Sequence, residues 1–204
     1  MDKSECIEDF QQLKEELVEY LSRISKAVEN IVFTIEENNI SILNDVDKVS
    51  KELSEVESVV STYFLNSLLS EYTNFTHEIS RAIHKLSIKG HGALIVIEKS
   101  DPVVPHIEEG TPVHARISSP LLESIFNPES QLHHGAVYIK EDSIISASNV
   151  LPTSKEVFWN RMFDIREMSA VGLSERCDAL ILIVSEMGSS SFCIGGNLYP
   201  FTAT

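Results

Sequence analysis

Residues 89–97 read Lys-Gly-His-Gly-Ala-Leu-Ile-Val-Ile, so a turn with two glycines runs directly into five consecutive apolar residues. A short apolar run that follows turn residues is typical of a strand buried on both faces. Ahead of the turn, apolar side chains recur at helical spacing, at positions 72, 75, 79, 83 and 86. This part of the sequence therefore predicts a helix, a turn and a central strand.

Further runs of β-forming residues follow this strand and are separated by Pro, Gly, Asp or Ser. They cover residues 113–117, 136–139, 143–146, 179–184 and 191–194. Helical pieces between some of them indicate an α/β domain, with a mixed β-sheet and helices around it. Gly188-Ser-Ser-Ser and Gly195-Gly-Asn predict hairpin turns, because they lack the surrounding strand and helix of a phosphate-binding loop.

The first 70 residues differ from the rest because they contain no Gly and no Pro. Their apolar residues recur in steps of three and four in two segments, which predicts two helices with a turn at Asn38-Asn39. The apolar positions are Ile7, Phe10, Leu17, Leu21, Ile24, Val28 and Ile31, and then Val46, Val49, Leu53, Val56 and Val60. We expect a helical hairpin over residues 1–70 and a second domain over residues 71–204. The hairpin either regulates the second domain or only assembles the chain into a homo-oligomer.

Composition excludes several classes of partner. The chain has 204 residues, 43% of them hydrophobic, which is enough for an ordinary core. Its net charge of -15 argues against a nucleic-acid or anionic lipid surface, since both need clustered Lys and Arg. The longest apolar runs, 93–97 and 179–184, are too short to span a membrane. Cys6, Cys177 and Cys193 lack metal-type spacing and indicate reduced thiols, as in the cytoplasm.

Residues 119–136 read Ser-Pro-Leu-Leu-Glu-Ser-Ile-Phe-Asn-Pro-Glu-Ser-Gln-Leu-His-His-Gly-Ala. This stretch resembles the segment that leads into the catalytic Asp-Gly-Ala motif of bacterial diadenylate cyclases. Residues 92–98, 149–152, 170–175 and 184–186 are similar to further pieces of that domain, in the same order. The two N-terminal helices resemble the sporulation-type branch of the family, in which such helices restrain activity and the chains form oligomers.

The resemblance implies an enzyme that joins two ATP molecules into cyclic di-AMP with the help of Mn or Mg. In the family two domains face each other and each supplies one nucleotide, so a homo-oligomer is implied. His134 and Arg166 would be catalytic, and His134 is also the candidate metal ligand. The substrate-binding residues implied are Leu94, Gly135, Ala136, Asn149, Leu151, Pro152, Glu167, Met168, Ser185 and Glu186.

The sequence departs from the family at two motifs. His134 stands where the family has an aspartate, and hard cations prefer oxygen ligands to an imidazole. Arg166-Glu167-Met168 stands where the family has Arg-His-Arg, and Asp164-Ile165 replaces the preceding Gly-Thr. The local charge turns from positive to negative, so we expect weaker binding of a triphosphate.

Two local expectations accompany these departures. Adjacent side chains on a strand point to opposite faces, so His133 and His134 are not expected to share one metal ion. The aromatic stretch 157–163 indicates a refilled pocket or a local helix. The sequence therefore predicts a diadenylate cyclase family protein with impaired activity. The alternative is a non-catalytic oligomeric or nucleotide-binding module on the same fold.

Overall fold

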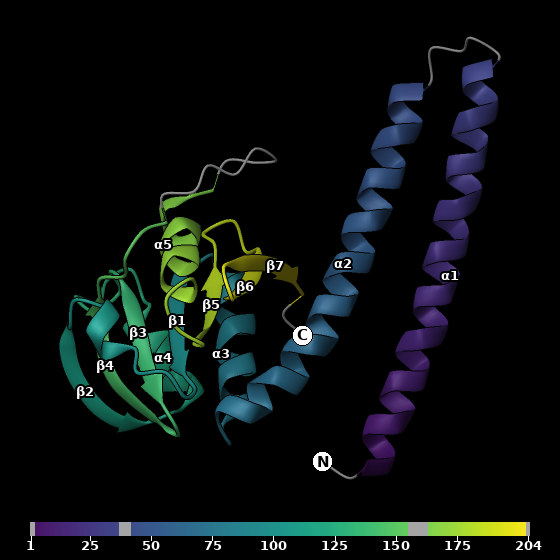
Figure 1. Ribbon diagram of the computed structural model, residues 1–204. Coiled ribbons are helices and arrows are strands. Elements are labelled where there is room, and N and C mark those ends of the chain that lie inside the picture. The colour runs from purple at the N-terminus through teal and green to yellow at the C-terminus, as the bar shows by residue number, and fades with distance from the viewer. Residues whose placement is uncertain (1–2, 37–41, 155–162, 203–204) are drawn as a thin grey trace. The chain divides into compact units, whose positions relative to one another are not determined.

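The computed structural model describes residues 3–36, 42–154 and 163–202 (Figure 1). The chain divides into two compact units, Met1–Val60 and Ser61–Thr204. This division lies ahead of the boundary expected between residues 70 and 71, because the last turns of the second helix pack within the second unit. The aromatic stretch 157–163 lies outside the described residues, apart from its last position.

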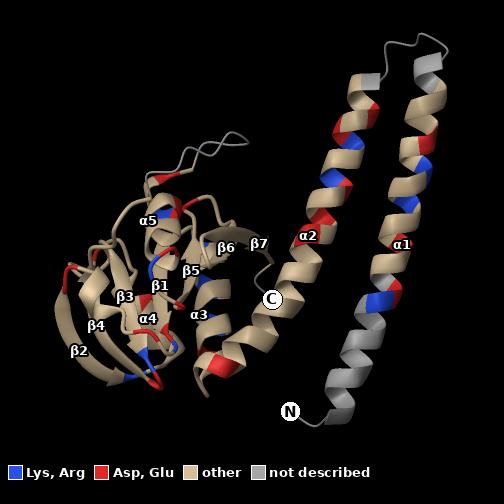
Figure 2. Ribbon diagram, in the orientation of Figure 1, with Lys and Arg blue, Asp and Glu red and all other residues tan. Residues whose placement is uncertain are grey.

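Two long helices begin the chain, as the apolar spacing predicts. They are α1 (Lys3–Glu36) and α2 (Ile42–Tyr72), and the turn expected at Asn38-Asn39 lies outside the described residues. Figure 2 shows acidic and basic positions interleaved along the coloured parts of both helices. With no Gly or Pro to interrupt them, both helices extend far beyond the usual three or four turns.

The apolar stripes of these helices are only partly covered. On α1 the side chain of Ile24 is buried, whereas Leu21 and Val28 of the same predicted seam are exposed. Several further large apolar side chains of the first unit are also exposed, namely Val18, Val32, Phe33, Leu43, Val46 and Leu53. The first unit therefore presents an apolar surface along both helices.

A mixed sheet forms the centre of the second unit. Within the described residues it has seven strands, in the order β2-β4-β3-β1-β5-β6-β7. The strands are β1 (Ala93–Glu98), β2 (Thr111–Arg116), β3 (Ala136–Lys140), β4 (Ser143–Asn149), β5 (Leu180–Val184), β6 (Ser190–Ile194) and β7 (Asn197–Phe201). β1 pairs with β3 in parallel, and the other neighbouring pairs are antiparallel. This confirms the predicted α/β class, and every residue of the central strand β1 is buried.

Helices cover both faces of the sheet (Figure 1). On one face, α3 (Thr76–Lys89) and α4 (Ser119–Ile125) pack with the end of α2 on side chains such as Ile95. On the other face, α5 (Ile165–Ser174) packs on Leu94 and Val96. A short 3-10 helix, η1 (Val104–His106), follows β1. The alternation along β1 thus divides the core into two layers.

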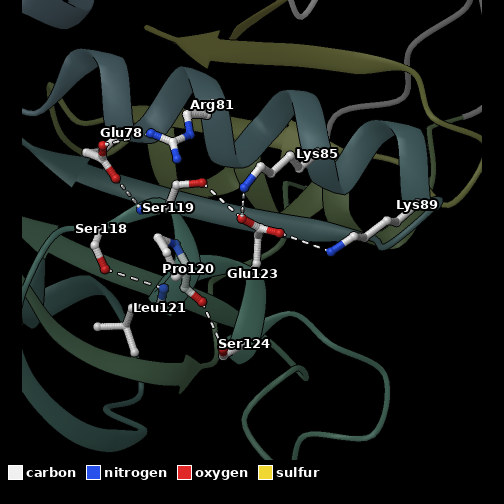
Figure 3. Close-up of polar contacts among 10 residues, drawn as sticks. All are labelled: Glu78, Arg81, Lys85, Lys89, Ser118, Ser119, Pro120, Leu121, Glu123 and Ser124. Carbon is white, nitrogen blue, oxygen red and sulfur yellow. Dashed lines mark hydrogen bonds and ion pairs between the residues drawn. The ribbon is translucent and has the colours of Figure 1, made fainter.

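Helix α4 docks on α3 through a charged cluster (Figure 3). The Glu123 carboxylate accepts hydrogen bonds from Lys85 Nζ at 2.8 Å, Lys89 Nζ at 3.0 Å and Ser119 Oγ at 3.0 Å. Burial raises the pKa of Glu123, but these three donors outweigh burial and lower the pKa to about 2. The Ser119 N–H donates to Glu78 Oε2 at 2.7 Å, which fixes the first turn of α4 against α3.

The end of α2 is anchored within the second unit. Leu65, Leu69 and Tyr72 are buried in the core layer that contains α3. The Tyr72 hydroxyl donates to the Asp178 carbonyl oxygen at 3.0 Å, and the Glu71 carboxylate pairs with Lys99 Nζ at 2.7 Å. The last turns of α2 are thus part of the second unit's core.

Candidate functional site

A cavity of about 400 Å³ opens on the α5 side of the sheet. The cavity lies where β1 and β3 begin and where β4 ends. Because β1 and β3 are parallel and β4 is antiparallel to β3, the starts of β1 and β3 and the end of β4 meet at the same edge of the sheet. The cavity walls come from Leu94, His133, His134, Gly135, Asn149, Val150, Leu151, Ile165, Arg166, Ser169 and Glu186. Strand ends and a helix N-terminus therefore meet at one hollow, and small ligands usually bind in concave sites of this kind.

The cavity brings together seven of the site residues expected from the sequence: Leu94, His134, Gly135, Asn149, Leu151, Arg166 and Glu186. Ala136, Pro152, Glu167, Met168 and Ser185 lie beside it in the chain and do not line it. His133, Val150, Ile165 and Ser169 line the cavity and were not expected. Each of these four residues lies directly beside an expected residue in the sequence, and Ser169 also lies about one helical turn from Arg166 on α5.

The Asn149 side chain connects several segments next to the cavity through hydrogen bonds. It is buried, and Nδ2 donates to the Ala136 carbonyl oxygen at 2.8 Å. Its Oδ1 accepts from the Gly110 N–H at 2.9 Å and from Ser146 Oγ at 2.8 Å. Gly135 has a φ of +77°, and a Cβ there would lie 2.5 Å from the Asn149 carbonyl oxygen. Glycine is thus required at this position, and the Asn149 side chain serves the backbone of the site.

The two histidines lie together, which corrects one expectation. His133 and His134 precede β3 and are not part of a strand, so they do not point to opposite faces. Both line the cavity, and their ring centroids are 3.8 Å apart. His133 Nδ1 is within hydrogen-bond distance of the Ser130 carbonyl oxygen, at 2.5 Å. A backbone contact of this kind restrains the orientation of the His133 ring.

Arg166 brings a positive charge to the wall of this cavity. Among the described residues that line it, no other is Lys or Arg. Its Nη2 pairs with Glu186 Oε1 at 3.0 Å, and the Arg166 side chain is 31% exposed while that of Glu186 is 69% exposed. The carboxylate of Glu186 therefore already occupies one edge of the guanidinium.

The N-terminus of α5 carries its own acidic cap. Asp164 is the N-cap, and its Oδ1 accepts from the Glu167 N–H at 2.8 Å. Glu167 Oε2 in turn accepts from the Asp164 N–H at 3.1 Å, which completes a capping box. Met168 follows in the helix, where its carbonyl oxygen accepts from the Ser154 N–H at 2.9 Å. The expected substrate residues Glu167 and Met168 thus act in the described structure as parts of α5.

Ser185 closes the turn between β5 and β6. Its N–H donates to the Ser189 carbonyl oxygen at 2.9 Å, and its hydroxyl lies 2.7 Å from Ser189 Oγ. Pro152 lies behind the cavity, where its carbonyl oxygen would be 2.3 Å from a Cβ at Gly172. Both residues shape the surroundings of the cavity, and neither lines it.

A buried carboxylate at the far end of β1 belongs to the core. Glu98 Oε2 accepts from the Tyr138 hydroxyl at 2.5 Å and from the Val103 N–H at 2.8 Å, and Lys140 pairs with Oε1 at 2.7 Å. Burial raises the pKa of Glu98, but the bonds from Lys140, Tyr138 and Val103 outweigh it and leave the pKa below its ordinary value. Burial and the bond to Glu98 raise the pKa of Tyr138.

The cavity residues do not match the ligand set of a hard divalent cation. Mg²⁺ and Mn²⁺ prefer carboxylate, carbonyl and water oxygens. The cavity offers two imidazoles and one carboxylate, Glu186, which is already paired with Arg166. Across residues 3–36, 42–154 and 163–202, no group of three or more His, Cys, Asp or Glu side chains could hold a metal ion. The Mn or Mg that the resemblance implies finds no ligand set in this part of the chain.

Comparison with known proteins identifies the family. A family model described as DisA bacterial checkpoint controller nucleotide-binding matches residues 80–198, which include every residue that lines the cavity. The chain belongs to the diadenylate cyclase family. A second family model, described as diadenylate cyclase CdaS, N-terminal, matches residues 4–72 and confirms the sporulation-type branch.

This diadenylate cyclase family protein is similar to curated relatives over most of its length. It is 42% identical over 183 residues to the cyclic di-AMP synthase CdaS of Bacillus subtilis (strain 168), which covers 89% of this chain and 87% of that one. It is 40% identical over 169 residues to the diadenylate cyclase CdaS of Bacillus thuringiensis (strain BMB171), covering 82% and 84%.

Solved structures share the fold of this family member. A crystal structure described as a hypothetical membrane spanning protein from Bacillus cereus is 35% identical, with a TM-score of 0.74 over 99% of this chain and 100% of that one. A double mutant of DacA from Staphylococcus aureus is 35% identical, with a TM-score of 0.58 over 61% of this chain and 83% of that one. In the described part of the present chain, no helix has the length and apolar character needed to cross a membrane.

Proposed function

We propose that this chain binds ATP in the cavity at the N-terminus of α5, and that it converts ATP to cyclic di-AMP far more slowly than its relatives. The observation that carries the proposal is that this one cavity joins the expected base-side residues, Leu94 and Leu151, to His134 and Arg166. Leu94 and Leu151 provide an apolar wall for an adenine ring, and Arg166 provides a cation for phosphate.

The reaction of the family explains the role of each group. A 3′-hydroxyl attacks the α-phosphorus of a second ATP, a P–O bond forms, and the bond to pyrophosphate breaks. His134 would lie at the attacking hydroxyl, where its imidazole can accept the hydroxyl proton as a general base. Arg166 would lie at the phosphates, where negative charge accumulates in the transition state. Because one cavity holds one nucleotide, a second copy of the chain must supply the other.

Three features support reduced activity. His134 replaces the family's aspartate, which removes a carboxylate from the site. Arg166 is the one cation among the described lining residues, and Glu186 already pairs with it. The helix N-terminus, which can otherwise bind phosphate, is capped by Asp164 and Glu167. Loss of several transition-state contacts together lowers a rate by orders of magnitude.

Turnover and binding test the two halves of the proposal separately. The purified chain is incubated with ATP and either Mn²⁺ or Mg²⁺, and cyclic di-AMP is quantified by chromatography beside an active relative. Titration calorimetry in low salt then measures the affinity of the chain for adenosine, AMP and ATP. We expect binding of adenosine, no gain in affinity from adenosine to ATP, and little product. Robust turnover, or ATP binding clearly tighter than adenosine binding, would contradict the proposal.

A second candidate function is assembly without catalysis, and the first unit supports it. Val18, Leu21, Val28 and Val32 of α1 are between 44% and 58% exposed, and they repeat at helical spacing. An apolar stripe of this kind on a charged helix is typical of a surface that a partner helix covers. We propose that a second copy of the chain covers it, so that the chain forms a homo-oligomer in solution.

A further inference from the structure

The turn Lys89–Gly92 contacts both members of the ion pair in the cavity. A Cβ on Gly92 would lie 2.6 Å from Arg166 Nη2, 2.7 Å from Cζ and 2.9 Å from Nη1. Because these three distances are nearly equal, the flat face of the guanidinium lies against the bare Cα of Gly92. No side chain other than hydrogen leaves room for Arg166 in this position.

The same turn contacts the residue that pairs with Arg166. Gly90 ends α3 with a φ of +64°, and a Cβ there would lie 2.9 Å from the Glu186 carbonyl oxygen. The Ser87 hydroxyl donates to the Gly188 carbonyl oxygen, and the Gly188 N–H donates to the Ser185 carbonyl oxygen at 3.0 Å. The end of α3 therefore fixes the β5–β6 turn that carries Glu186.

We propose that Gly92 and Gly90 are positioning residues of the nucleotide site. Gly92 lets the Arg166 guanidinium lie flat at the wall of the cavity, and Gly90 lets the Glu186 backbone approach closely enough for its carboxylate to hold that guanidinium. The turn thus decides where the Arg166 guanidinium lies. This proposal deepens the proposed function and rests on it only for the identity of the ligand.

The kind of contact decides what a substitution at Gly92 does. Gly92 has no positive φ, so its backbone conformation is open to alanine. The atoms that the new methyl group would meet belong to the far end of a flexible side chain. Arg166 can move away at little cost, so the Gly92→Ala variant should fold normally and hold Arg166 in a different place. Gly90→Ala would instead strain the helix end, so it is not used as the test.

Nuclear magnetic resonance tests the positioning without any ligand. The Nε–H signal of Arg166 is assigned by its loss in Arg166→Lys. We expect this signal to shift in Gly92→Ala and in Glu186→Gln, which removes the charged partner. Val104→Ala is the control, because Val104 is exposed on η1 and does not line the cavity. An unshifted Arg166 signal in a folded Gly92→Ala variant would overturn the proposal.

Binding of AMP and adenosine shows whether the position matters for phosphate. We expect Gly92→Ala to lower the affinity for AMP about tenfold and to leave the affinity for adenosine unchanged. The loss of one hydrogen bond to a charged group accounts for a factor of this size. In an Arg166→Ala background, Gly92→Ala should have no further effect on AMP. An equal loss of AMP binding in that background would show that Gly92 acts through the backbone, which would overturn the proposal.

The two proposals fail in different ways. If the Arg166 signal shifts as expected but neither AMP nor adenosine binds to any variant, the nucleotide-binding function is wrong and the positioning by Gly92 stands. If AMP binds and the Arg166 signal does not respond to Gly92→Ala, the positioning is wrong and nucleotide binding stands.

Discussion

Asp164 and Glu167 satisfy each other's backbone N–H groups at the N-terminus of α5, with Oδ1 of Asp164 at 2.8 Å from the Glu167 nitrogen and Oε2 of Glu167 at 3.1 Å from the Asp164 nitrogen. This arrangement stabilises the helix, because each carboxylate also faces the positive end of the helix dipole. It also places two negative charges beside Arg166 in the sequence. The same contacts that begin α5 thus oppose a phosphate group at its N-terminus.

The first prediction follows from these charges. The double variant Asp164→Asn, Glu167→Gln keeps side chains that can accept the capping bonds and removes both negative charges. We expect the affinity for ATP to rise severalfold relative to adenosine, because repulsion of the phosphates is removed. Calorimetry at low and high salt measures the ratio of the ATP affinity to the adenosine affinity. High salt should reduce the increase in this ratio, because it screens the charges. Glu55→Gln with Glu57→Gln, two exposed positions on α2, is the control for total charge.

The second prediction concerns recovery of catalysis. His134→Asp alone should not restore cyclic di-AMP synthesis, since the phosphate contacts are still lacking. His134→Asp combined with Asp164→Gly, Ile165→Thr, Glu167→His and Met168→Arg should raise the rate by more than the product of the separate effects, because such groups act together. Product formed from ATP with Mn²⁺ is the measurement. A large recovery from His134→Asp alone would show that the altered phosphate motif is harmless.

The third prediction concerns where the second unit begins. Leu65, Leu69 and Tyr72 are buried, with 4%, 1% and 6% of their surface exposed. A fragment of residues 61–204 retains these three residues, and a fragment of residues 73–204 lacks them. We expect the longer fragment to unfold cooperatively and the shorter one to be strongly destabilised or unfolded. Each buried leucine that is lost costs about 2–5 kcal/mol.

A point substitution tests the same packing in the full chain. Leu69→Ala should lower the melting temperature followed by circular dichroism, and Leu53→Ala, at an exposed site on the same helix, should not. Equal stability of the two fragments would contradict the assignment of these turns to the core of the second unit.

The fourth prediction is a dependence of stability on pH. The pKa of Glu123 is about 2 in the folded protein and lies below its ordinary value of 4.5. The folded state therefore binds fewer protons than the unfolded chain, and the stabilisation is complete above the ordinary pKa and is lost as the pH falls toward 2. Glu123→Gln should cost about 1–2 kcal/mol at pH 7, since Lys85 and Lys89 are partly exposed and screened.

The melting temperatures of the wild type and of Glu123→Gln, measured between pH 7 and pH 3, test this pH dependence. The difference between wild type and Glu123→Gln should shrink as the pH falls. Glu129→Gln, at an exposed position, is the control and should show no such trend. A difference that stays constant with pH would mean that the charge of Glu123 does not stabilise the contact between α3 and α4.

The fifth prediction concerns the apolar surface of α1. Leu21 is 52% exposed, and Leu21→Lys should weaken assembly because a charge would be buried in the contact between copies. Light scattering over a range of concentrations measures the change in mass. Glu19→Gln changes the net charge by the same amount at an exposed polar site of the same helix. A monomer in both variants and in the wild type would rule out the proposed homo-oligomer.

Apolar patterns predicted most of the fold. The run 93–97 forms the central strand β1, and the buried runs become its neighbours, because a strand covered on both faces has little choice of residues. The strand β7 was not predicted, and Pro200 within it lowers any strand signal. Helix α4 is too short for helical spacing to appear, although its N-cap Ser118 and the following Pro120 are typical of a helix start.

The site was less predictable than the fold. The resemblance supplied Leu94, Gly135 and Arg166, which the structure brings to one cavity. The neighbouring histidines were misjudged, because the prediction placed His133 on a strand that begins only at Ala136. The contact between Gly92 and Arg166 spans about half of the second unit in sequence, and neither spacing nor composition indicates it.

The order of strands also limits how copies of this protein can join. The two outer strands, β2 and β7, each contain a proline, Pro112 and Pro200, and β2 has an irregular register between Pro112 and Ala115. A proline offers no N–H to an incoming strand, and an irregular register bends the rim away from one. Growth of the sheet from copy to copy, the route that leads to fibres, is therefore disfavoured at both rims. In the proposed homo-oligomer, copies of the chain would then meet through side chains, which permits a closed assembly of defined size.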